Sequence, residues 1–147
     1  MKIIRLALAT LCFFTIVGSQ AAQEAKKAVF NDQNLEWGPC PEMFPQGCEV
    51  TVLQGDPSQG PSDVFLKFPA NYNVPAHTHT SPEHMTLVSG ELEVTYQGQQ
   101  KMTLQEGDYA FGPAKLAHNA KCISKEDCVL MIVFERPIDA FPFKGKL

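Results

Sequence analysis

Arginine is nearly absent from this 147-residue chain, which has Arg5, Arg136 and no other guanidinium group. Lysine is scattered rather than clustered, and 12 basic side chains face 16 acidic ones. A nucleic-acid surface needs concentrated positive charge, and a phosphate clamp is commonly built from several guanidinium groups. The composition therefore argues against both kinds of site, and we expect no nucleic-acid partner.

Long hydrophobic runs are also missing, apart from one at the N-terminus. Lys2 and Arg5 come first, and the apolar residues 6–17 follow them. This run is too short to span a bilayer but has the length of a signal-peptide core. Small residues stand at the two positions that a signal peptidase reads before the bond after Ala21. We therefore expect residues 1–21 to be a signal peptide, and the mature protein to be soluble, exported to a bacterial periplasm and free of membrane.

Internal repeats and low-complexity tracts are absent too. Without residues 1–21 the chain has 126 residues and ten basic against sixteen acidic side chains, a net charge of −6. This length is typical of one domain. We divide it into residues 22–59, a leader with a proline-rich loop and a first strand, and residues 60–147, the main folded core.

No two cysteines have the tight Cys-x2-Cys spacing of a thiolate metal site. The mature chain has Cys40, Cys48, Cys122 and Cys128, an even number in an exported protein, and four cysteines allow three disulfide pairings. Local pairing is favoured, because the first two bracket a proline-rich loop and the last two flank a hairpin connection. A thiolate metal site is the less favoured alternative, since an exported protein tends to oxidise its thiols.

Histidine is rare, but three of the four histidines form a pattern with one glutamate. His77 and His79 alternate in a β-type segment, so both project from the same face of a strand. Glu83 opens the next strand after the break at Ser81-Pro82, and His118 follows about forty residues after the pair. Three imidazole nitrogens and a carboxylate oxygen suit one divalent transition metal, such as Fe, Mn, Zn, Cu or Ni, and leave a position open for a ligand.

These residues resemble the two cupin motifs. The run from His77 to Gly90 matches histidine-x-histidine-x3-glutamate-x6-glycine, with Asn71 in place of the leading glycine. The second motif, glycine-x5-proline-x-glycine-x2-histidine-x3-asparagine, is met by three residues and missed by two. Gly107, Pro113 and His118 meet it, whereas Lys115 and Cys122 depart from it. Asparagine visits left-handed backbone readily, but Lys115 predicts a strained turn beside the site.

The resemblance covers roughly residues 60–136, and it is closest to small bacterial single-domain cupins. Short β-type segments separated by turn residues fill this part of the chain. We expect nine strands, over residues 48–54, 64–68, 76–80, 83–89, 91–96, 99–104, 108–112, 117–123 and 128–135. The resemblance implies an all-β fold, the double-sheet jelly roll or cupin β-barrel, whose inner faces line a cavity.

The histidines of the two motifs would lie inside that cavity beside apolar side chains. We expect these to include Phe65, Met85, Tyr109, Phe111 and Phe134. His84, which alternates with Glu83 and Met85, should face outward instead. Jelly rolls also leave two sheet edges exposed, so we expect a homodimer.

Three functions are compatible with such a site. The first is a metal-dependent oxidoreductase, most plausibly a dioxygenase, in which Glu83 is a ligand and a candidate catalytic base for a small oxygen-rich substrate. The second is a non-catalytic periplasmic protein that binds a metal or a small ligand, and a cupin that has kept the residues but lost the ion is a related alternative. The third, a metal-sensing module like the cupin part of certain anti-sigma factors, is disfavoured by expected export and by the lack of a helical regulatory region.

Overall fold

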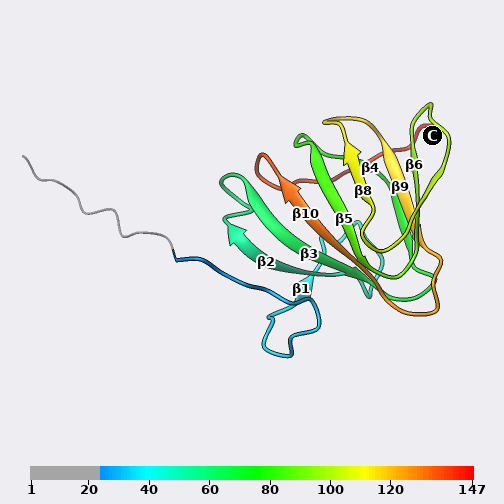
Figure 1. The fold of residues 1–147 in the computed structure, drawn as a ribbon. Helices are drawn as coiled ribbons and strands as arrows, with labels where there is room; N and C mark the ends of the chain where they lie inside the picture. Colours follow the sequence, from blue (N-terminus) through cyan, green and yellow to red (C-terminus); the bar gives the residue numbers. More distant parts are fainter. Residues whose placement is uncertain (1–23) are drawn as a thin grey trace, which may run out of the picture.

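The computed structural model describes residues 24–147 (Figure 1). The expected signal peptide, residues 1–21, and its cleavage site lie outside the described residues. Within the described chain there are eleven strands and no helix. The strands are β1 Gly38–Pro39, β2 Glu49–Gly55, β3 Ser62–Phe68, β4 Asn73–Thr78, β5 Glu83–Ser89, β6 Leu92–Tyr96, β7 Met102–Leu104, β8 Tyr109–Gly112, β9 His118–Cys122, β10 Cys128–Phe134 and β11 Phe141–Pro142.

The strands form two antiparallel sheets. The larger sheet has six strands in the order β1-β2-β3-β10-β5-β8, and the smaller has five in the order β11-β4-β9-β6-β7. Figure 1 shows the long strands β3, β5 and β10 side by side, with β4, β6 and β9 in the second layer. The expected all-β jelly roll is confirmed. Strands β2 and β3 pair across residue 60, so residues 22–59 and 60–147 share the larger sheet.

All nine expected strands are present, with ends that differ by a few residues. The expectation missed β1 and β11, which have two residues each and lie outside the nine expected ranges. Both include a proline, which a strand tolerates at an edge, and each is the outermost strand of its sheet. Two residues are too few for an alternating pattern to appear in the sequence.

The alternation of side chains divides the core from the surface. On β5 alternate side chains are buried. These are Glu83, Met85 and Leu87, whereas His84 and Thr86 are partly exposed. Facing residues from the other sheet, such as Leu92 and Val94 on β6, are also buried. The apolar core therefore fills the space between the two sheets, and Glu83 is one of the few charged groups placed within it.

Two non-glycine residues adopt left-handed backbone, both at motif positions where glycine is usual. Asn71 has a φ of 62° and Lys115 a φ of 65°. The expected strained turn at Lys115 is therefore present. The amide of Lys115 donates a 2.7 Å hydrogen bond to the carbonyl of His79, which ties this turn to the segment that bears the histidine pair.

Both local disulfides form as expected. Cys40 bonds to Cys48, and Cys122 bonds to Cys128, so no thiolate metal site arises from these cysteines. Two disulfides suggest an oxidising, extracellular type of environment. Among residues 24–147 no helix is long and apolar enough to cross a membrane.

Candidate metal centre

Three elements bring the four expected ligand residues together. His77 lies on β4 and pairs with His118, the first residue of β9, in the smaller sheet. His79 follows the end of β4, and Glu83 opens β5 in the larger sheet. The site therefore spans the gap between the two layers, and the buried side chains of all four residues face one another.

The three imidazole rings are oriented by main-chain carbonyls. The Nδ1 atom of His77 is 2.7 Å from the carbonyl oxygen of Pro75, and that of His118 is 3.1 Å from the carbonyl oxygen of Leu116. The Nδ1 atom of His79 contacts the carbonyl oxygen of Asp139. A carbonyl only accepts hydrogen bonds, so each Nδ1 carries a proton, and a ring in its neutral form presents the lone pair of Nε2.

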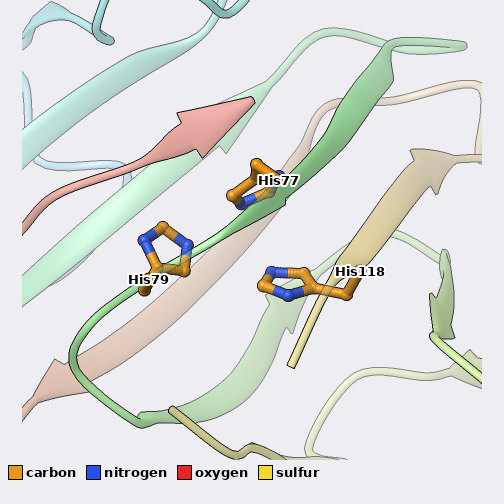
Figure 2. Close-up of side chains that lie close together, drawn as sticks. All are labelled: His77, His79 and His118. Carbon is orange, nitrogen blue, oxygen red and sulfur yellow. The ribbon is translucent and has the colours of Figure 1, made fainter. Parts of the chain in front are cut away.

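The rings point toward a common centre (Figure 2). Their ligand atoms all lie within 4.8 Å of one another, and the ring centroids of His77 and His118 are 4.3 Å apart. Glu83 lies beside two of the rings. Its Oε1 atom is 3.1 Å from Nε2 of His79, and its Oε2 atom is 3.3 Å from Nε2 of His118.

These short contacts do not satisfy the buried polar atoms. His79 Nε2 and Glu83 Oε2 have no hydrogen-bond partner within the described chain. Leaving such atoms unpaired in the interior is costly. A cation shared by Nε2 and carboxylate atoms would satisfy them, and the donor set suits a divalent transition ion. The residues present therefore fit a metal ion.

Electrostatics within the cluster couples the charge of the carboxylate to that of the rings. Burial lowers the pKa of His77 to about 4, helped by repulsion from His118 and His79. Burial also lowers the pKa of His118. The pKa of His79 is raised, because attraction to Glu83 outweighs the effect of burial. Burial alone would raise the pKa of Glu83, yet contact with His79 and the other rings lowers it overall. The carboxylate is therefore ionised, and two of the rings are held neutral.

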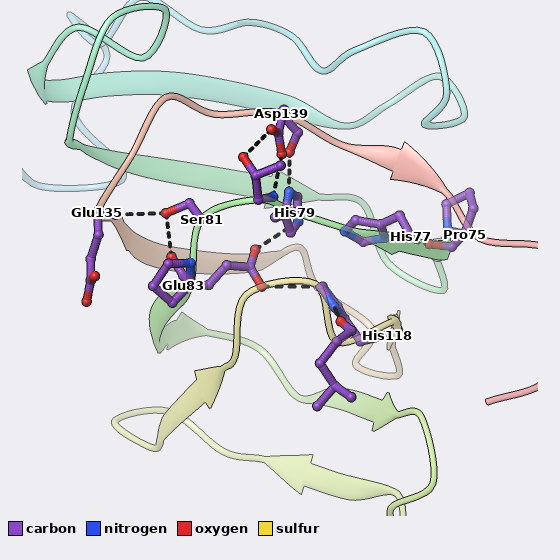
Figure 3. Close-up of polar contacts among 11 residues, drawn as sticks. Pro75, His77, His79, Ser81, Glu83, His118, Glu135 and Asp139 are labelled. Carbon is purple, nitrogen blue, oxygen red and sulfur yellow. Dashed lines mark hydrogen bonds and ion pairs between the residues drawn. The ribbon is translucent and has the colours of Figure 1, made fainter.

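The segment after β10 supports the site from the side opposite Glu83 (Figure 3). The carboxylate of Asp139 accepts hydrogen bonds from the amide of Thr80, at 2.8 Å, and from its hydroxyl. The hydroxyl of Ser81 accepts from the amides of Glu135, at 2.9 Å, and Arg136, at 3.1 Å. Residues 80 and 81 are thus fastened to the C-terminal segment directly after His79. The sequence patterns did not identify this support, since Asp139 lies in no motif.

A close approach at β8 shapes the same end of the site. Glu83 pairs with Gly112 across β5 and β8, and a Cβ at Gly112 would lie 2.9 Å from Glu83 Oε2 and 3.1 Å from the hydroxyl oxygen of Tyr96. The Tyr96 hydroxyl is buried without a hydrogen-bond partner in the described chain. Burial, and then the charge of Glu83, raise the pKa of this hydroxyl. Glycine is therefore required at position 112 for the carboxylate to occupy its place.

A cavity of about 550 Å³ opens from the cluster between the sheets, and all four expected ligand residues line it. Met85 and Phe134 line it as expected. The expectation was wrong for Phe65, Tyr109 and Phe111, which alternate with inward-facing neighbours and lie on the other face of the larger sheet. Tyr109 is 59% exposed and Phe111 is 47% exposed. Their places on the inner face are taken by Ala110 and Gly112, both buried.

His84 faces away from the cluster, as expected. Its Nδ1 atom is 2.7 Å from the hydroxyl of Tyr109, and its Nε2 atom is 2.9 Å from Oε1 of Glu135. This contact set is on the partly exposed outer face of the larger sheet. His84 is therefore not a member of the metal cluster.

Sequence comparison assigns the chain to a family. Residues 25–138 match the family described as the ChrR cupin-like domain. The chain belongs to this cupin family. The match begins well before residue 60, so the family domain includes β1, β2 and the disulfide loop between them. No curated protein matches the sequence of this cupin.

Solved structures share its fold at low sequence identity. The polyketide cyclase RemF from Streptomyces resistomycificus is 15% identical with a TM-score of 0.67, and the match covers 84% of this cupin and 88% of RemF. A chain from crystal structures of the DMSP lyases RdDddP and RnDddQII is 16% identical with a TM-score of 0.64. That match covers 75% of this cupin and 63% of the lyase chain, so the cupin spans less than two thirds of that protein.

Oxalate decarboxylase from Bacillus subtilis, a protein described by its Mn(II) centers, is a further structural neighbour. It is 17% identical with a TM-score of 0.59, over 67% of this cupin and 29% of the decarboxylase chain. The three neighbours are named for different reactions, a cyclisation, a lyase reaction and a decarboxylation. At these identities the likeness establishes the fold and leaves the reaction to be argued from the site.

Proposed function

We propose that His77, His79, Glu83 and His118 bind one divalent transition metal, and that the protein is an exported metal-dependent oxidoreductase of the dioxygenase type. Its substrate would be a small organic molecule with an oxygen-rich end. The observation that supports this proposal is the arrangement of the three rings, whose Nδ1 atoms are held by main-chain carbonyls and whose ligand nitrogens lie within 4.8 Å of one another in the lining of a cavity.

When bound, such a metal supplies Lewis acidity and, if it is iron, manganese or copper, redox chemistry with dioxygen. The chain itself contributes a dry, enclosed position for the reacting end of the substrate, because the four residues are at least 93% buried. Glu83 is the group that would move a proton. Once detached from the metal, its carboxylate can accept the proton of an enolic or phenolic hydroxyl brought to the site, because Oε2 has no hydrogen-bond partner in the described chain.

One observation favours a second candidate, a binding protein without turnover. Apart from the four ligand residues, the only ionisable side chain of the described residues that lines the cavity is Glu42, which is exposed. Glu83 would therefore have to act both as a ligand and as the sole proton-transfer group near the substrate. A protein that merely holds a metal, or a metal with a small ligand, has no need of a second group.

Metal analysis followed by oxygen uptake separates these candidates. Protein purified from its native compartment should contain close to one transition-metal ion per chain. A panel of diketones, catechols and hydroxy acids should then include at least one compound that triggers oxygen consumption, and His77→Ala should abolish it. Stoichiometric metal with no oxygen uptake across the panel would support the binding protein, and protein without metal would contradict both candidates.

We also propose that the protein works in the periplasm. The two disulfides and the signal-peptide pattern of residues 1–21 support this location. The mature N-terminus should then be Ala22, and an intact-mass measurement on secreted protein that still contained Met1 would contradict it.

A further inference from the structure

The cavity that opens from the metal centre is far larger than the centre itself. Its volume of about 550 Å³ falls in the range of pockets that enclose drug-sized ligands. Apolar side chains from both sheets form its walls. They include Val64 and Leu66 on β3, Leu92 and Val94 on β6, and Leu130 and Ile132 on β10. A short diacid or hydroxy acid would fill only the end beside the histidines and leave these walls without contact.

Among residues 24–147, no positively charged side chain lines this cavity. Lys67 alternates with two lining residues of β3 but faces the opposite side, where its Nζ atom lies 2.6 Å from Glu49 and 4.3 Å from the ring centre of Trp37. In the described part of the chain, the one charged side chain that joins the metal-site residues in the lining is acidic Glu42. A carboxylate carried on the apolar body of a ligand would thus be buried without a positively charged partner.

The loop between Cys40 and Cys48 forms part of the cavity wall and reaches the metal centre, where the ring of Phe44 lies edge-on to that of His77 with centroids 5.2 Å apart. Cys40 and Phe44 from this loop line the cavity, and so do Pro57 and Ile138, which are joined by a 2.7 Å hydrogen bond from the amide of Ile138 to the carbonyl of Pro57. Val52 lines the same space and is 47% exposed. Val52 therefore marks a point where the cavity meets solvent.

We propose that the cavity binds an amphiphilic ligand, with metal-binding oxygens at one end and an uncharged, apolar body that fills the space between the sheets. The oxygen end of this proposal rests on the proposed metal centre. The apolar end rests on the cavity walls alone. Short dicarboxylates, and ligands with an anionic tail, are disfavoured as physiological ligands.

Titration calorimetry on metal-loaded protein tests the proposal with three matched catechols. These are catechol, 4-(3-methylbutyl)catechol, and 3-(3,4-dihydroxyphenyl)propanoate, whose carboxylate has nearly the shape of the branched alkyl end. Each buried methylene adds about fourfold to affinity, so the alkyl compound should bind at least about 30-fold more tightly than catechol. It should also bind at least about tenfold more tightly than the propanoate. Equal affinities, or tighter binding of the propanoate, would overturn the proposal.

A positive charge at Val52, where the cavity meets solvent, gives a second test. Val52→Arg should strengthen binding of the propanoate by about tenfold and leave catechol unchanged, whereas Val29→Arg is the matched control. Val29 is 40% exposed and does not line the cavity, so this variant should bind all three compounds as the parent does. If both arginine variants strengthened propanoate binding equally, general surface charge would explain the effect and the proposed tail site would be wrong.

An experiment on metal-free protein distinguishes failure of the apolar site from failure of the metal centre. The neutral dye N-phenyl-1-naphthylamine should bind chelator-treated protein with a rise in fluorescence, and the alkyl catechol should displace it. Dye binding to protein that takes up no metal would keep the apolar site and refute the proposed metal function. Metal uptake without dye binding or an alkyl preference would refute the apolar site alone.

Discussion

His79 and Asp139 are 60 residues apart in the sequence, yet the carbonyl oxygen of Asp139 accepts the hydrogen bond from Nδ1 of His79. The carboxylate of the same aspartate binds both the amide and the hydroxyl of Thr80. One residue of the C-terminal segment therefore fixes the orientation of a candidate metal ligand and the backbone directly after it. Partners of this kind raise the metal affinity of the ligand that they orient.

Asp139→Ala should weaken metal binding about tenfold. The main-chain carbonyl remains in this variant, but the contacts that hold it beside His79 are lost. Asp139→Asn, which keeps one acceptor oxygen, should lose less. A competition titration with a chromophoric chelator measures the change, and Asp127→Asn, in an exposed loop, is the control. Unchanged affinity in Asp139→Ala would show that the C-terminal segment does not position His79.

The two disulfides should have similar effects on stability but different effects on the cavity. Each closes a loop of fewer than ten residues, so replacing either pair with serine should lower the free energy of unfolding by about 2–3 kcal/mol. Only the bond between Cys40 and Cys48 belongs to the cavity wall. Denaturant titration should therefore show two similar losses, whereas binding of N-phenyl-1-naphthylamine should weaken only in the Cys40/Cys48 variant. Equal loss of dye binding in both variants would contradict this role of the loop.

Metal-free protein should lose stability as the pH falls from about 7 to 4. The pKa of His77 is lowered to about 4, mainly by burial, so the unfolded chain takes up a proton in this window that the folded chain does not. The upper limit of the loss is about 3 kcal/mol. Glu83, with its lowered pKa, acts in the same direction at the acidic end. His79 acts oppositely, because its raised pKa contributes stability that is lost as the pH rises.

Thermal unfolding in the presence of a chelator, from pH 7 to pH 4, measures this dependence. His77→Leu removes the titrating ring and keeps an apolar side chain in its place. Its melting temperature should fall less steeply with pH than that of the parent. Parallel curves for the two proteins would show that protonation of His77 does not oppose folding.

The homodimer expected from the sequence stays a prediction, and the structure suggests which edge to test. Strand β8 is the last strand of the six-stranded sheet, and its outward side chains Tyr109 and Phe111 are exposed. An unpaired strand edge with exposed aromatic side chains favours contact with a second copy. Light scattering at micromolar concentration should give the mass of a dimer for the parent and for Val29→Glu, and a smaller mass for Phe111→Glu. A monomeric parent would contradict the prediction.

Periodicity and turn residues predicted nine of the eleven strands in the described chain, and the histidine spacing together with the cupin resemblance predicted the four candidate ligand residues. The alternation of His77 and His79, and of Glu83 with Met85, placed these side chains on inner faces, and the structure agrees. The sequence could not predict which groups orient the rings, because these groups are main-chain carbonyls and every residue has one. Asp139 was equally hidden, since only the folded chain brings it beside His79.

The choice of cavity walls failed where hydrophobicity was given more weight than alternation. Phe111 seemed a natural wall residue, but Gly112 is the partner of Glu83 across the sheet, and the residue before it must face outward. The space beside Glu83 and Tyr96 accepts no side chain at position 112. A small residue on the inner face was therefore the informative signal, and the neighbouring aromatic residue marked the outer surface.

The central claim is that His77, His79 and His118 share one metal ion with Glu83. The most direct test is the metal content of five purified proteins, the parent and the variants His77→Ala, His118→Ala, Glu83→Gln and His84→Ala. We expect close to one ion per chain in the parent and in His84→Ala, little in the two cluster histidine variants, and an intermediate amount in Glu83→Gln, whose amide keeps an oxygen but loses the charge. Equal metal content in all five proteins would show that the ion binds elsewhere and would contradict the account.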